Sequence, residues 1–170
     1  MANRSSDRMD LAEQLNYQNK LVAQLPSPQL RVVYNKSGMH VVAAKVTDRR
    51  ALIENGLYWT TPASESEANY LCAILNSPYL TDLVRPLMSY GKDERDVAKN
   101  VWELPIPEFD ESDDLHLLLA KSGGILESEV ANIDTTSTSH NPTLRREYRT
   151  LLDESVTMLQ VNELVLDLLS

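Results

Sequence analysis

The sequence of 170 residues has few of the features that secreted, membrane-spanning or metal-binding proteins require. Its one cysteine, Cys72, cannot form an intramolecular disulfide. No apolar run approaches the roughly 18 residues that a membrane span needs, and the polar N-terminal residues lack the apolar centre of a signal peptide. We therefore expect a cytoplasmic protein that does not enter a membrane, built as one domain or as one domain with a helical appendage.

Recognisable catalytic motifs are also missing. There is no glycine-rich phosphate loop and no nucleophile elbow. His40, His116 and His140 are scattered, and with a single cysteine they lack the spacing of a zinc site. The acidic residues between Asp110 and Asp114 are better explained as charges that stabilise a helix N-terminus than as a metal site. We predict no catalytic residue, no cofactor and no metal ion in this chain.

Basic residues become scarce toward the C-terminus. The net charge of −9 divides into +3 for residues 1–60, −2 for residues 61–100 and −10 for residues 101–170. Contacts from lysine and arginine to phosphate supply most non-specific DNA affinity. Any nucleic-acid-binding face is therefore expected within the first hundred residues, and the acidic third would face away from a duplex or toward a basic partner.

The first sixty residues predict a helix and then a small antiparallel sheet. The helix is expected over residues 7–25, where Leu11, Leu15, Val22 and Leu25 form one apolar stripe. Residues 30–35 and 39–46 are rich in β-formers and flank a turn. Asn55-Gly56 suits a second hairpin turn, between short strands at 52–53 and 57–60. We thus expect four short strands.

The rest of the chain predicts helices. Ser64 and Glu67 form a capping-box pattern that starts a helix ending near Pro78, and a second helix follows to Met88. A further helix is expected over residues 112–131, weakened midway by Gly123-Gly124. The last helix starts at Asn141-Pro142 and is apolar on two sides near its end. The fold class is therefore α+β: a small antiparallel sheet packed by helices, with helices at both termini.

Two segments carry a family resemblance. The helix Glu67-Ala68-Asn69-Tyr70-Leu71-Cys72-Ala73-Ile74-Leu75-Asn76-Ser77 is followed by Leu104-Pro105-Ile106-Pro107. Around them, in order, lie Arg31 to Gly38, Leu57-Tyr58-Trp59, Gly91 to Val97 and Phe109-Asp110. This block resembles the C-terminal target-recognition region of N6-adenine DNA methyltransferases, the TaqI-like and type IIG restriction–modification group.

The resemblance implies a specificity region without its enzyme. It covers residues 28–120, between an N-terminal helix (1–27) and an acidic helical C-terminal region (121–170). The Asn/Asp-Pro-Pro-aromatic loop and the S-adenosylmethionine site of such enzymes are missing from the sequence. The chain would then recognise double-stranded DNA for a methyltransferase catalytic domain or subunit on another polypeptide or a longer one. S-adenosylmethionine would bind that full enzyme and not this chain.

Eight residues in or near predicted turns are candidates for DNA contact: Asn35, Lys36, Arg49, Arg50, Asn55, Tyr90, Lys92 and Arg95. Basic and amide side chains on a hairpin turn can recognise base edges in the major groove, and basic groups on a glycine-containing loop can hold phosphates. Any one of them can also be an ordinary solvated surface group. The resemblance itself identifies no base-reading residue.

A second function is open on the same evidence. The acidic C-terminal region and the two-sided apolar last helix also suit a protein–protein interaction module, which would dock a basic partner or form a homodimer through that helix. The charge balance favours this alternative, whereas the predicted hairpin turns and the order of the motifs favour DNA recognition.

Overall fold

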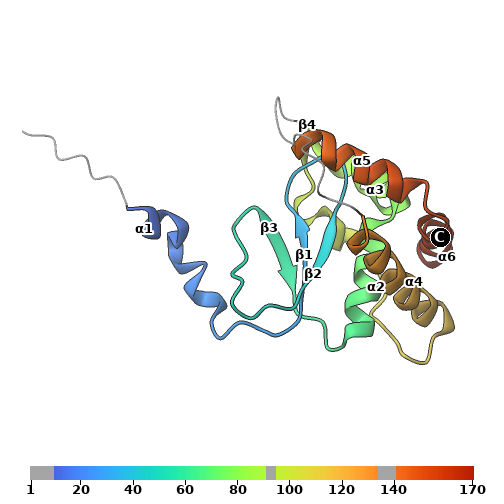
Figure 1. The fold of residues 1–170 in the computed structure, drawn as a ribbon, viewed down its shortest axis with the longest axis horizontal. Coiled ribbons are helices and arrows are strands. Elements are labelled where there is room, and N and C mark those ends of the chain that lie inside the picture. Colours follow the sequence, from blue (N-terminus) through green and yellow to red (C-terminus); the bar gives the residue numbers. More distant parts are fainter. Residues whose placement is uncertain (1–9, 91–94, 134–140) are drawn as a thin grey trace, which may run out of the picture.

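The computed structural model describes residues 10–90, 95–133 and 141–170 and has the expected α+β architecture (Figure 1). Three strands form an antiparallel sheet in the order β2-β1-β3: β1 is Arg31–Asn35, β2 is Ala43–Val46 and β3 is Leu57–Thr60. A separate two-stranded ribbon pairs β4 (Ser89–Tyr90) with β5 (Arg95–Asp96). Helices precede and follow the sheet, as the sequence predicts.

The expectation of a fourth strand at residues 52–53 is wrong. These residues belong to the segment 47–56, which crosses from the end of β2 to the start of β3 without joining the sheet. Ile53 pairs instead with a side chain, since the Gln24 amide donates to the Ile53 carbonyl and accepts from its N–H, both at 2.8 Å. The Gln24 side chain therefore satisfies both backbone groups of Ile53, as a neighbouring strand would otherwise do.

Both faces of the central strand β1 are buried. Val32 and Tyr34 point into the main core, with 0% and 1% of their surface exposed. On the other face Arg31 is fully buried and donates to the carbonyls of Asp48 and Ala51, each at 2.8 Å. The segment 47–56 is therefore held over the second face of the sheet by a buried guanidinium.

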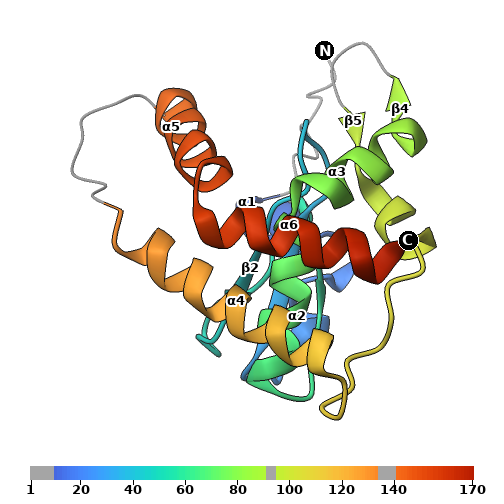
Figure 2. The ribbon, with the colours of Figure 1, turned by 90° about the vertical axis from the view of Figure 1, so that its right-hand side faces the viewer.

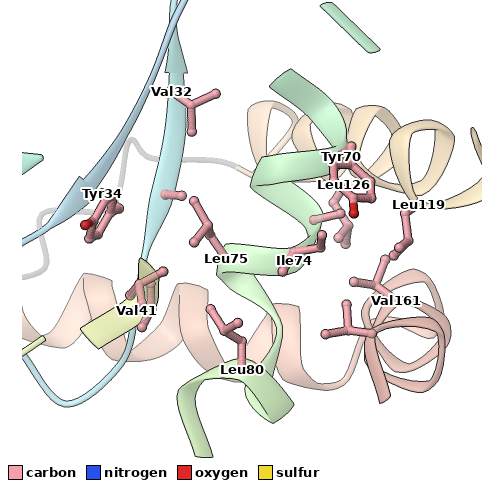
Figure 3. Packing of buried hydrophobic residues seen from close by; sticks show 14 of the residues in the cluster. Val32, Tyr34, Val41, Tyr70, Ile74, Leu75, Leu80, Leu119, Leu126 and Val161 are labelled. Carbon is pink, nitrogen blue, oxygen red and sulfur yellow. The ribbon is translucent and has the colours of Figure 1, made fainter. Parts of the chain in front are cut away.

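Helix α2 (Glu65–Asn76) is the centre of the molecule. Tyr70, Ile74 and Leu75 are fully buried, and α2 packs on β1 and β2 to one side and on α4 (Asp114–Ala131) and α6 (Val156–Leu169) to the other (Figures 2 and 3). Ser64 caps it as predicted, but the Glu67 carboxylate accepts from the N–H of Ala63 rather than of Ser64.

The helices around α2 complete the core. Ser77 ends α2 and caps α3 (Pro78–Val84), which is followed by the 3-10 turns η3 (Arg85–Leu87) and η4 (Ala98–Glu103). The expected boundary between residues 120 and 121 falls inside α4, and Met158, Val161 and Val165 of α6 share one core cluster with Val32 of the sheet. The α4 helix continues unbroken through Gly123 and Gly124, and at Gly123 it lies close against the backbone of α2.

The N-terminal helix is much shorter than predicted. The α1 helix covers Leu11–Leu15, with Asp10 and Glu13 forming its capping box, and is followed by the 3-10 turns η1 (Tyr17–Asn19) and η2 (Val22–Gln24). The Asn16 side chain accepts from the N–H groups of Leu21 and Val22, and such local bonds compete with helix continuation. The four residues of the predicted apolar stripe are exposed: Leu11 (71%), Leu15 (55%), Val22 (56%) and Leu25 (57%).

The C-terminal helix is divided in two. The α5 helix (Asn141–Asp153) ends at a turn, and Ser155 caps α6 by accepting from the N–H of Met158. Within the helices that the structure describes, none is long and apolar enough to cross a membrane.

Candidate nucleic-acid interface at the hairpin end of the sheet

The end of the sheet where β1 finishes, called the hairpin end below, holds the 36–42 turn and the Asn55-Gly56 turn. Asn35 pairs with Leu57 across β1 and β3, and the Lys36 N–H donates to the Gly56 carbonyl at 3.1 Å. Both turns predicted from the sequence therefore come together, although they belong to different connections of the chain.

Asn35 shapes the turn and is not available to a ligand. Its amide nitrogen donates to the carbonyls of Ser37 and His40, and its oxygen accepts from the N–H of Val42 at 2.8 Å. Gly38 has a φ of 145°, a conformation that L side chains rarely adopt. The side-chain amide of Asn35 thus satisfies backbone groups of the turn that have no partner strand. Asparagine often has this role in turns.

Lys36 and Asn55 form the exposed polar centre of the hairpin end. The Lys36 ammonium donates to the Asn55 side-chain oxygen at 3.0 Å and lies 4.6 Å from the ring centroid of Tyr58. The Tyr58 ring also stacks on Tyr34, with ring centroids 5.4 Å apart. A cation over an aromatic face is held in place and partly desolvated. The structure therefore presents one fixed positive charge beside a side-chain amide.

The β4–β5 ribbon adjoins the same place. The N–H of Val97, the residue after β5, donates to the Lys36 carbonyl at 2.8 Å. This hydrogen bond holds the ribbon beside the hairpin end. Tyr90 and Arg95 are paired within the ribbon. Their side chains, and Lys92 altogether, lie outside the described residues, so the predicted contacts of these three remain predictions.

Arg49 and Arg50 lie at the other end of the sheet. Their segment is held by Arg31, which pairs with Val46 at the opposite end of β1 from Asn35, about 14 Å away by strand rise. Arg50 forms a salt bridge with Asp48 at 2.9 Å, a pairing that lowers the pKa of the Asp48 carboxyl. The predicted basic residues are therefore divided between two ends of the sheet.

Two arginines that the sequence analysis did not select lie near the hairpin turn. Burial first, and then the positive charges of Arg149 and Arg85, lower the pKa of His40. Arg85 pairs with Asp82 at 3.4 Å, and Arg149 pairs with Asp153 at 3.1 Å. Arg149 belongs to α5, so a basic residue of the acidic C-terminal third lies close enough to His40 to affect its pKa. No sequence pattern indicates this, because the approach is made by tertiary packing.

Cys72 is not a nucleophile candidate. Its thiol lies near the ammonium of Lys45, which contacts the exposed carboxylates of Glu127 at 2.7 Å and Glu65 at 3.1 Å. Burial raises the pKa of the Cys72 thiol to about 12, with a smaller opposite effect of Lys45. A thiol of this kind stays protonated and unreactive at neutral pH.

We expect Cys72 to resist alkylation until the chain unfolds. At pH 8 the folded thiol should form about a thousandth of the thiolate that an unfolded cysteine forms, because the two pKa values differ by about three. Iodoacetamide labelling, followed by mass spectrometry with and without urea, measures the ratio. Equal rates in both conditions would show that the folded structure does not raise the pKa of the half-buried Cys72 thiol.

Comparisons with known proteins leave the family resemblance as a proposal. No protein-family model matches the chain, and neither a curated protein nor a solved structure matches it. Among the described residues, no group of three or more histidine, cysteine, aspartate or glutamate side chains could hold a metal ion.

Proposed function

We propose that the chain recognises a DNA target for an N6-adenine methyltransferase or restriction–modification system whose catalytic part is a separate or preceding unit. The observation that carries the proposal is the meeting of Lys36, Asn55 and the β4–β5 ribbon at the hairpin end. A fixed ammonium suits a DNA phosphate, and a neighbouring amide suits a base edge. In this proposal the protein is cytoplasmic and S-adenosylmethionine binds the catalytic unit.

The distribution of charge is compatible with this role. The hairpin end has Lys36 and the nearby Arg85 and Arg149, although each arginine also has a carboxylate partner. The two arginines at the opposite end of the sheet are not needed for the same contact. We therefore assign the duplex to the hairpin end alone and expect weak, salt-dependent affinity in the absence of the catalytic unit.

Exposed apolar residues on α6 favour protein interaction as a second candidate function. Val156 (81%), Leu159 (57%) and Leu166 (43%) are exposed, whereas Met158, Val161 and Val165 of the same helix are buried. Apolar side chains in helical register on an outer face are typical of helix-mediated association. A catalytic subunit or a second copy of the chain could cover this exposed face of α6. This function and DNA recognition are therefore compatible.

Replacing Lys36 with alanine should weaken duplex binding and reduce its dependence on salt. If Lys36 neutralises one phosphate, the slope of log K against log salt should fall by about 0.9. Fluorescence anisotropy with a labelled duplex, measured on the whole chain between about 50 and 200 mM salt, determines the slope. The whole chain is required because removal of α6 would take Val161 and Val165 out of the core.

Lys121→Ala is the matched control. Lys121 is exposed on α4, so its loss changes the net charge equally without touching the hairpin end. We expect Lys121→Ala to leave the slope unchanged. Equal effects of the two variants would contradict the proposed contact, and a chain that forms dimers without salt-dependent DNA affinity would favour the second candidate function.

A further inference from the structure

A groove lies between the N-terminal arm, residues 10–25, and the sheet. Its volume is about 550 Å³, within the range of about 300–1,000 Å³ that small-molecule sites occupy. Tyr17 and Lys20 line it from the arm, and Lys36, Asn55 and Trp59 line it from the sheet side. The two walls are joined by the buried pair of hydrogen bonds between Gln24 and the backbone of Ile53, so the groove is part of the fold.

The charges that line the groove favour an anion. Lys20 comes from one wall and Lys36 from the other, and neither forms a salt bridge within the described residues. The one carboxylate on the lining, Glu54, accepts from the N–H of Gly56 at 2.6 Å and is thereby engaged in its own turn. Two lysines that face one concave space raise the local potential for an anionic ligand, even in a chain of net charge −9.

The remaining lining groups favour a planar, hydrogen-bonding ligand. Tyr17 is 54% exposed and Trp59 is half-buried, so both have ring surface to offer. Tyr58 is already engaged, because its ring stacks on Tyr34 and lies 4.6 Å from the Lys36 ammonium. Asn55 uses its oxygen for Lys36, which leaves its amide nitrogen as a donor. Aromatic surface, an amide and two cations are the groups that proteins use for a nucleobase and its phosphate.

We propose that this groove binds a nucleoside 5′-monophosphate unit, either free or as one unpaired residue of a strand. The phosphate lies between Lys20 and Lys36, and the base lies against Tyr17 and Trp59. This site shares Lys36 and Asn55 with the hairpin end, but Lys20 and Tyr17 belong to the arm, so it can be tested separately from duplex recognition. The site would be present in a chain that had no affinity for duplex DNA.

The test is a titration of the whole chain with adenosine 5′-monophosphate, adenosine and inorganic phosphate, followed by NMR or calorimetry. We expect saturable binding of the monophosphate and about tenfold weaker binding of adenosine and of phosphate, since each lacks half of the contacts. A short unpaired oligothymidylate is the second arm. Tighter binding of the oligomer assigns the site to a strand residue, and tighter binding of the monophosphate assigns it to free nucleotide.

Variants of the arm separate this site from the hairpin end. Lys20→Ala and Tyr17→Leu should each weaken monophosphate binding about tenfold, whereas Tyr17→Phe and Lys121→Ala should leave it unchanged. Lys20→Ala should also leave the salt slope of duplex binding unchanged, so failure of one proposal is distinguishable from failure of the other. The inference is overturned by the absence of saturable binding, by equal affinity for adenosine and its monophosphate, or by an unchanged affinity in Lys20→Ala.

Discussion

Replacing Gly123 with alanine is expected to lower the free energy of unfolding by about 3 kcal/mol. A Cβ at this position of α4 would lie 2.3 Å from the Asn69 carbonyl oxygen and 2.9 Å from the Asn69 carbonyl carbon. These are backbone atoms of α2, so relief requires the two helices to move apart. Because α2 also packs on the sheet and on α6, the separation would loosen contacts throughout the core.

Gly124→Ala is the control for Gly123→Ala. The nearest atom to a Cβ at Gly124 is the Asn69 amide nitrogen, at 3.2 Å, which can move with its flexible side chain. Alanine also has the higher helix propensity, by about 1 kcal/mol, so Gly124→Ala should be neutral or stabilising. Urea unfolding of both variants gives the comparison. A Gly123→Ala chain as stable as the native one would mean that α2 and α4 do not approach so closely.

Replacing Arg31 with methionine is expected to destabilise the chain by about 2–5 kcal/mol. Methionine fills much of the same apolar volume but leaves the carbonyls of Asp48 and Ala51 without their buried donor. The segment 47–56 would then lose its hold on the second face of the sheet. We expect this segment to become sensitive to limited proteolysis at denaturant concentrations where the rest of the chain is still folded.

Arg50→Met is the control for Arg31→Met. It removes an arginine of the segment 47–56 itself, but the Arg50 side chain is 91% exposed and its salt bridge with Asp48 is on the surface. Surface pairs of this kind contribute about 0–1 kcal/mol. Urea unfolding and proteolysis of the two variants in parallel measure the difference. If Arg31→Met unfolds like Arg50→Met, the buried guanidinium does not stabilise the segment.

The candidate site shows where sequence reasoning was sufficient and where it was not. The turns at Asn35 and at Asn55-Gly56 were predictable, because asparagine and glycine in turns are local signals. Which turns meet was not predictable. The pairing of β3 with β1 brings Asn55 to Lys36, and the same topology places Arg49 and Arg50 at the far end of the sheet.

The N-terminal arm illustrates a second limit. Its leucines have helical spacing, but a stripe of this kind forms a long helix only when another surface buries it. Within the described part of the chain no such surface covers Leu11 or Leu15, and Asn16 bonds the backbone of the next turn instead. The groove that results depends on contacts between residues far apart in the sequence, above all Gln24 and Ile53.

The sequence by itself determined the α+β class, the cap at Ser64 and the antiparallel pairing, since these depend on alternation, turn residues and backbone bonds within a few positions. Tertiary structure alone decided which basic groups share a surface, that Arg31 is buried as a structural residue, and that Gly123 is a point of close helix contact. The physical reason is the range of the interactions: local bonds are set by neighbouring residues, whereas packing and electrostatic proximity are set by elements that meet only after folding.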